Sequence, residues 1–159
     1  MNAVQKLRKV VELDPGDPIA HEFLAVALEA KGLRSESLAQ NDLARQSPSG
    51  MSFVTGTIAG VYCRQGRQDE ARKMLVQLEA AARESYVSSL QLAMIRLALG
   101  ETDAAFRLLN RAVEERSVNL QYAGVDPVFD SVRRDPRFIA VRNRMGLPEA
   151  AWATGLIAK

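Results

Sequence analysis

The chain has 159 residues, of which 47% are hydrophobic and 25% charged, a composition typical of a globular domain with a hydrophobic core. Its net charge of +2 is too small to indicate binding to nucleic acid or to an anionic membrane. Cys63 is the only cysteine, which excludes an internal disulfide and a cysteine metal cluster and is typical of a reducing compartment.

The first segment, residues 1–16, predicts a helix with one apolar side. Val4, Leu7, Val10 and Val11 recur at helical spacing, and the charges between them are not typical of a signal peptide. We therefore expect a cytoplasmic protein. Asp17-Pro18 follows as an N-cap and first-turn proline, which predicts that the next helix begins there.

Residues 17–119 contain a repeat of 34 residues. Gly32, Gly66 and Gly100 each fall between two apolar stretches, where a left-handed helix cap lets the chain reverse. The repeat predicts three antiparallel helix pairs, residues 17–50, 51–84 and 85–119, and Thr102 is a further expected N-cap. Other positions in phase are Leu24, Ile58 and Leu92; Ala25, Ala59 and Ala93; and Ser37, Ala71 and Ala105.

The residues within the repeat resemble a known pattern. The first helices read His21-x2-Leu24-Ala25-x2-Leu28, Thr55-x2-Ile58-Ala59-x2-Tyr62 and Ser89-x2-Leu92-Ala93-x2-Arg96, and the second read Ser37-x3-Asn41, Ala71-x3-Leu75 and Ala105-x3-Leu109. This pattern resembles the tetratricopeptide repeat (TPR) family, although no tryptophan opens a repeat and Asn41 and Arg96 stand at aromatic positions. The resemblance implies an all-α, right-handed superhelix of antiparallel helix pairs. Residues 1–16 would then be the second helix of an incomplete repeat, either because the chain is a fragment or because that edge meets another subunit.

Gly56 and Gly60 lie in an uncharged run within the second repeat. A phosphate-binding loop would need a preceding strand, and the run is too short for a membrane helix with a dimerisation face. Both glycines are therefore expected inside a helix, where each destabilises it by roughly 1 kcal/mol relative to alanine. Either this helix tolerates them, or another group packs closely against that face.

The resemblance also implies a binding surface, because the first helices of TPR proteins line a concave groove that holds peptides. The implied lining residues are Glu22, Val26, Glu29, Phe53, Gly56, Gly60, Cys63, Leu90 and Met94. Gly56 and Gly60 would leave a shallow floor in this groove. The best-known peptide-binding members grip a C-terminal carboxylate with basic side chains, which this set lacks. We expect an apolar or amphipathic segment instead, with a basic end near Glu22 and Glu29.

The first helix of the third repeat, within residues 86–99, is apolar on nearly all sides. Its groove side must therefore be covered by a ligand or by the chain's own C-terminus. Residues 120–147 predict two capping helices, with Asp126-Pro127 and Asp135-Pro136 as their starts and Gly146 as an end. The pattern DPxFDxxRxDPRF resembles the ends of bacterial TPR regulators. Residues 148–159 form a tail with Trp152.

The sequence favours a non-catalytic module that binds a protein or peptide and needs no cofactor or metal. The alternative is a regulatory C-terminal tail of a larger bacterial signalling or transcription regulator, with the groove filled by its own C-terminal helices. His21, the only histidine, is expected to be a packed ring rather than a catalytic base. Partners are expected to be proteins, including a second copy through the N-terminal edge, and neither a membrane nor nucleic acid is favoured.

Overall fold

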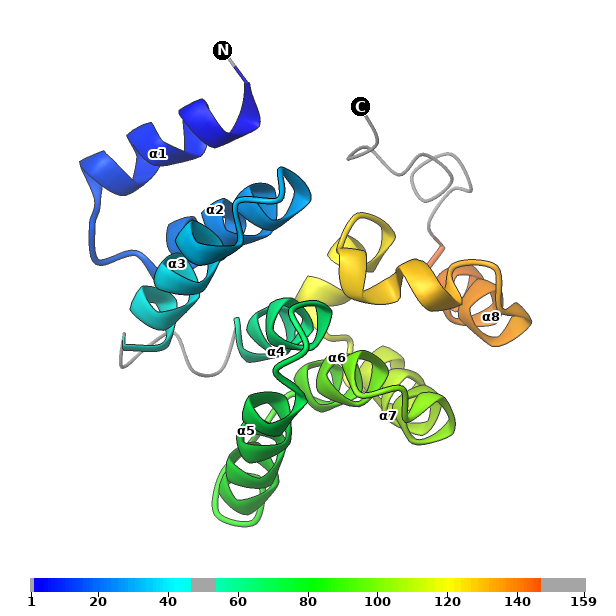
Figure 1. Ribbon diagram of the computed structural model, residues 1–159. Helices are drawn as coiled ribbons and strands as arrows, with labels where there is room; N and C mark the ends of the chain where they lie inside the picture. Colours follow the sequence, from blue (N-terminus) through cyan, green and yellow to red (C-terminus); the bar gives the residue numbers. More distant parts are fainter. Residues whose placement is uncertain (1, 47–53, 147–159) are drawn as a thin grey trace.

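The computed structural model describes residues 2–46 and 54–146, and these residues are all-helical, with no strand among them. This confirms the predicted all-α class. In chain order the elements are α1 (Ala3–Leu13), α2 (Pro18–Ala30), α3 (Arg34–Gln46), α4 (Thr55–Arg64), α5 (Gln68–Ala81), α6 (Ser89–Ala98), α7 (Thr102–Glu114), the 3-10 helices η2 (Val118–Gly124) and η3 (Pro127–Val132), and α8 (Pro136–Arg144) (Figure 1).

The helix ends follow the local signals in the sequence. Gly32, Gly66 and Gly100 have φ angles of 73°, 79° and 80°, which confirms the predicted left-handed caps between the helices of each pair. Asp17 accepts a hydrogen bond from the backbone N–H of Ile19 at 2.9 Å and so caps α2 as predicted. The expectation for Thr102 was wrong. Because the chain turns at Gly100, α7 begins with Thr102 itself and its N-cap is Glu101.

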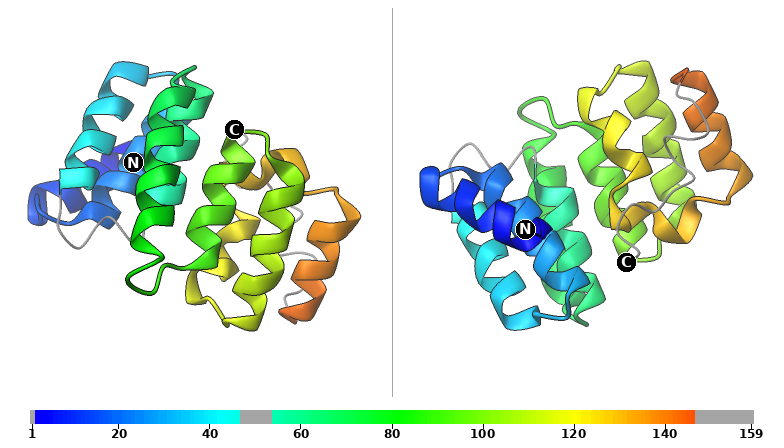
Figure 2. Two further views of the ribbon diagram at one scale, coloured as in Figure 1. Left: turned by 90° about the horizontal axis from the view of Figure 1, so that it is seen from below. Right: turned by 90° about the horizontal axis from the view of Figure 1, so that it is seen from above.

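The helices form an arc whose inner side is lined by the first helix of each pair. α2, α4 and α6 pack side by side, and α3, α5 and α7 lie behind them on the outer side (Figure 1). Figure 2 shows α5, α6, α7 and α8 next to one another in chain order. α1 packs Val4 against Leu24 and Leu28 of α2, and Leu13 at its end remains 87% exposed.

The C-terminal 3-10 helices lie on the inner side of the arc, above α4 and α6 (Figure 1). Phe129 of η3 is buried and stacks on Phe138 of α8, with the ring centroids 5.4 Å apart. The same cluster of buried apolar residues contains Leu90 and Met94 of α6. The chain's own C-terminal segment therefore covers much of the groove side of α6.

Candidate functional site: a cavity between α2 and the C-terminal 3-10 helices

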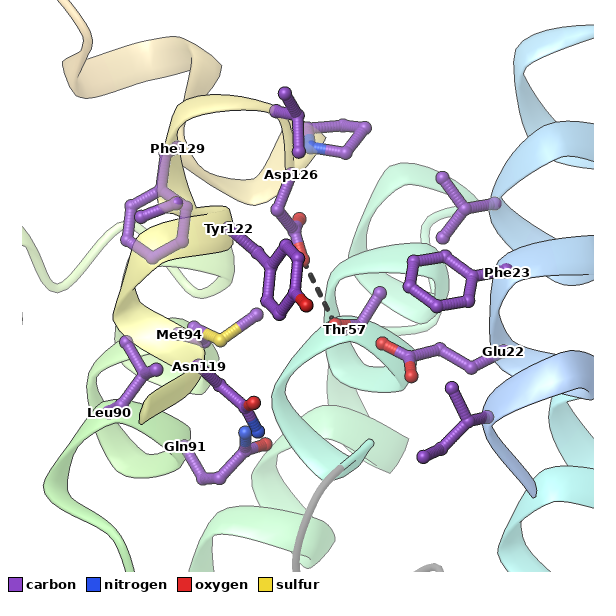
Figure 3. Close-up of a pocket in the computed structure, with 15 residues that line it drawn as sticks. Glu22, Phe23, Thr57, Leu90, Gln91, Met94, Asn119, Tyr122, Asp126 and Phe129 are labelled. Carbon is purple, nitrogen blue, oxygen red and sulfur yellow. Dashed lines mark hydrogen bonds between the residues drawn. The ribbon is translucent and has the colours of Figure 1, made fainter. Parts of the chain in front are cut away.

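The inner side of the arc contains an open cavity of about 370 Å³ (Figure 3). α2 forms one wall with Glu22, Phe23 and Val26, and η2 and η3 form the opposite wall with Tyr122 and Asp126. Thr57 of α4 and the α6 residues Leu90, Gln91 and Met94 contribute the remaining surface. The cavity is thus bounded by three repeats and by the C-terminal segment.

Most of the lining is apolar, and two aromatic rings stand at its open side. Phe23 is 49% exposed and Tyr122 is 52% exposed, and they face each other from opposite walls (Figure 3). Exposed aromatic side chains around a concave apolar surface are typical of a binding site.

Arg133 holds the C-terminal wall in place. Its guanidinium donates to the backbone carbonyl of Asp126 at 3.0 Å, to that of Ala123 at 3.2 Å and to that of Gly124. Its Nε also donates to Oδ1 of Asp130 at 2.7 Å. Because a 3-10 helix leaves carbonyls without a helical partner at its C-terminal end, Arg133 supplies a donor to Ala123 and Gly124 at the end of η2. It gives the carbonyl of Asp126 a second donor besides the backbone N–H of Phe129.

Asp126 connects η3 to α4. One carboxylate oxygen accepts from the backbone N–H of Val128 at 2.9 Å and caps η3, as the Asp-Pro pattern predicts. The other accepts from the hydroxyl of Thr57 at 2.9 Å, which is the dashed contact in Figure 3. The residue therefore both caps η3 and connects the C-terminal wall of the cavity to α4.

Glu22 faces the same hydroxyl from α2. Burial raises the pKa of Glu22 to about 7, the hydrogen bond with Thr57 opposes this increase, and the nearby negative charge of Asp126 adds to it. Burial also raises the pKa of Asp126, against the opposing effects of its hydrogen bonds and of Arg64 and Arg133. Two carboxyl groups thus meet at one hydroxyl in an apolar cavity.

Gly56 and Gly60 do not form an open floor, and this expectation of the sequence analysis was wrong. Both are buried inside α4 because other elements pack on them. A β-carbon on Gly56 would lie 2.6 Å from Cβ of Met94, and one on Gly60 would lie 3.3 Å from Cγ2 of Val128. The close packing comes from α6 and η3, which settles the alternative that the sequence left open.

The structure brings together four of the predicted groove residues in the cavity: Glu22, Val26, Leu90 and Met94. Glu29 lies outside its lining and accepts a hydrogen bond from Nε2 of Gln65. Cys63 also lies outside it and packs partly buried beside the core of the second repeat, where burial raises the pKa of its thiol. Phe53 lies outside the described residues.

The site residues that were not predicted from the sequence include Phe23, Thr57, Tyr122 and Asp126. Asp126 had been explained fully as a cap, and Tyr122 lies after the repeat ends. Phe23 directly follows Glu22, a predicted groove residue, and this adjacency was the available signal in the sequence.

The lone histidine is a structural residue. His21 is 4% exposed, and its ring nitrogens lie 2.6 Å from Oε1 of Gln40 and 2.9 Å from the carbonyl oxygen of Pro15. Within residues 2–46 and 54–146, no three His, Cys, Asp or Glu side chains are grouped to hold a metal ion. The described helices include none with the length and apolar character needed to cross a membrane.

Comparisons of the chain with protein-family models, with curated proteins and with solved structures found no match.

Proposed function

We propose that the chain is a non-catalytic, TPR-like cytoplasmic module that binds a short apolar or amphipathic segment of another protein in the cavity between α2 and η2–η3. The observation that carries this proposal is the open apolar cavity with Phe23 and Tyr122 exposed on opposite walls. The 34-residue repeat and the arc of helix pairs support the TPR-like part.

The cavity has a suitable size for a peptide. Its volume is about 370 Å³, whereas an apolar cavity of about 150 Å³ already holds a benzene ring. Two side chains of the size of leucine or phenylalanine therefore fit. Binding would come mainly from burial of apolar surface, at roughly 25 cal/mol per Å² before the costs of ordering are subtracted.

Selection of short random peptides on the purified protein tests this proposal. We expect enriched peptides with two apolar residues, and we expect Phe23→Ala to weaken their binding about tenfold, a typical loss for an aromatic contact residue. Leu43→Ala is the matched control, because Leu43 on α3 is 44% exposed and lies outside the cavity lining. Peptides that bind Phe23→Ala as well as wild type would place the site elsewhere, and the absence of any enriched peptide would contradict the proposal.

A second candidate function is a regulatory tail whose groove is occupied by its own C-terminal helices. The contact of Val128 with the face of Gly60 favours it, because η3 already fills the part of the groove over α4. In this case η3 would have to leave the groove before a partner could enter.

A disulfide across that contact separates the two functions. A β-carbon on Gly60 would lie 3.6 Å from Cβ of Val128, which is within the range of natural disulfides. We expect Gly60→Cys with Val128→Cys, in a Cys63→Ala background, to form the bond on oxidation. Retained peptide binding after oxidation would support the cavity as described, whereas binding that returns only on reduction would support the regulatory tail.

A further inference from the structure

The charges of the cavity have one sign. Of the fifteen residues that line it, Glu22 and Asp126 are the charged ones, and none of the fifteen is lysine, arginine or histidine. The chain as a whole carries a net charge of +2. The cavity is therefore an acidic site in a slightly basic protein.

The two carboxylates differ in how much of their hydrogen-bonding capacity the protein uses. Asp126 accepts from Val128 N–H and from the Thr57 hydroxyl, and Arg64 and Arg133 lie close enough to favour its charge. Glu22 has the Thr57 hydroxyl as a hydrogen-bond partner and the negative Asp126 as its charged neighbour. A hydroxyl has a single proton to donate, and an ionised carboxylate has about four acceptor sites. Glu22 thus retains capacity for a further donor.

We propose that the cavity selects a protein segment in which a lysine or arginine side chain, flanked by apolar residues, inserts between Phe23 and Tyr122 and pairs with Glu22. This inference rests on the proposed function and specifies the chemistry of its partner. The apolar stem of the basic side chain would pack against the exposed rings, and its charged end would reach the carboxylate. Such a pair, partly removed from water, forms a charge-assisted hydrogen bond.

The pair also predicts that binding depends on pH. Because Glu22 has a pKa of about 7 in the folded protein, it is largely protonated below neutrality and must lose this proton when a cation binds. The other ionisable groups of the cavity lining are Asp126, the N-cap of η3, and Tyr122 on η2, while Arg64 on α4 and Arg133 after η3 act on Asp126. Burial raises the pKa of Asp126 as well, against the opposing effects of Arg64 and Arg133, so the comparison with Glu22→Gln identifies the part of the pH dependence that comes from Glu22.

Short random peptides are again the probe, selected in parallel on the wild-type protein and on Glu22→Gln. We expect a lysine or arginine between apolar residues in the peptides enriched on wild type and no such preference on Glu22→Gln. Synthetic copies of an enriched peptide, with its basic residue kept or replaced by norleucine, then give affinities. We expect wild type to bind the basic form about tenfold more tightly than the norleucine form. We expect Glu22→Gln to bind the two forms with about equal affinity. Glu29→Gln is the matched control, since Glu29 lies on the same helix outside the cavity lining.

The pH dependence gives an independent readout. We expect the affinity of wild type for the basic peptide to rise about tenfold from about pH 5.5 to about pH 7.5, and that for the norleucine form to stay constant. Peptides that bind in the cavity, are lost in Phe23→Ala and show no basic preference would overturn this inference and leave the proposed function intact. If basic peptides bind the full-chain variant Lys159→Ala but not wild type, the chain's own terminal lysine competes with them, which would overturn the inference of an external partner.

Discussion

Gly56 and Met94 are in direct contact across the α4–α6 interface, and a β-carbon on Gly56 would stand 2.6 Å from Cβ of Met94. We expect Gly56→Ala to lower the free energy of unfolding by about 1–3 kcal/mol, because the backbones must separate to admit the methyl group. This is the net loss, because the crowding outweighs the roughly 1 kcal/mol that alanine gains over glycine in a helix. Chemical denaturation monitored by circular dichroism measures it.

Gly60→Ala is the matched comparison within the same helix. Its β-carbon would meet Cγ2 of Val128 and Nη1 of Arg64, both at 3.3 Å, and these side-chain ends can shift by a few tenths of an ångström. We expect a change within about 1 kcal/mol of wild type, because the gain in helix propensity offsets the crowding. Equal destabilisation by the two substitutions would contradict the difference in packing.

Stability is expected to decrease with rising pH because of Glu22. Its pKa is about 7 in the folded protein and 4.5 in an unperturbed glutamate, so between these values the folded state binds more protons than the unfolded state. The contribution of Glu22 to the free energy of unfolding therefore falls by at most about 3 kcal/mol as pH rises from about 4.5 to about 7. Above about pH 7 this contribution is constant. The raised pKa of Asp126 contributes with the same sign.

Denaturation curves at several pH values between about 5 and about 8 test this, with the difference between wild type and Glu22→Gln as the quantity of interest. Glutamine keeps a partner for the Thr57 hydroxyl without a charge, so the variant should gain stability relative to wild type as pH rises. Glu29→Gln, on the same helix outside the cavity lining, is measured as the control. A constant difference between wild type and Glu22→Gln would show that Glu22 does not titrate in this range.

Arg133 is expected to determine whether the C-terminal wall of the cavity stays docked. Arg133→Ala leaves the carbonyls of Ala123, Gly124 and Asp126 without this donor, so we expect a loss of about 2–3 kcal/mol and increased binding of a hydrophobic dye. Arg133→Lys should recover less than half of the stability that Arg133→Ala loses, because one ammonium group cannot reproduce the planar guanidinium fork. The exposed neighbour Arg134 supplies the control, and Arg134→Ala with the same effect would rule out a specific role for Arg133.

Asn41 is expected to be a site where the protein can gain stability. Its side chain is fully buried in α3, and neither its amide nitrogen nor its amide oxygen has a hydrogen-bond partner in the described part of the chain. Leucine has the branching and the number of side-chain heavy atoms of asparagine, although its methyl groups are larger, and Asn41→Leu removes both unpaired groups. We therefore expect a net gain of about 1–2 kcal/mol in thermal or chemical denaturation.

Ser37 provides the contrast on the same helix face. Its hydroxyl is buried but donates to the carbonyl of Ala25 at 2.9 Å, so Ser37→Ala should be neutral or slightly destabilising. A loss of stability in Asn41→Leu would contradict the view that the amide is unpaired.

Local signals in the sequence predicted the parts of the fold that depend on neighbouring residues. The glycines that reverse the chain at Gly32, Gly66 and Gly100, and the Asp-Pro starts at Asp17, Asp126 and Asp135, need only the conformation of a few consecutive residues. The position of Gly56 and Gly60 inside a helix was predicted for the same reason. The right-handed TPR superhelix remains a prediction.

The composition of the site could be predicted only in part, because it depends on contacts between distant segments. The resemblance to TPR proteins implied that Glu22, Val26, Leu90 and Met94 share one surface, and the cavity contains all four. The resemblance could not show that η3 returns over α4, because residues 120–146 lie beyond the periodic part and their path depends on where Phe129 and Val128 find apolar partners. Tyr122 and Asp126 join the cavity only through that return.

The start of α4 has a consequence for the order in which this protein can fold. Its N-cap residue, Val54, makes no side-chain capping bond, and the backbone N–H of Gly56 instead donates to Oε1 of Gln91 in the next repeat at 2.7 Å. The first turn of α4 is therefore completed only when α6 is in place. During synthesis on the ribosome, the second repeat would wait for the third, so these two pairs should acquire their native structure together rather than one after the other.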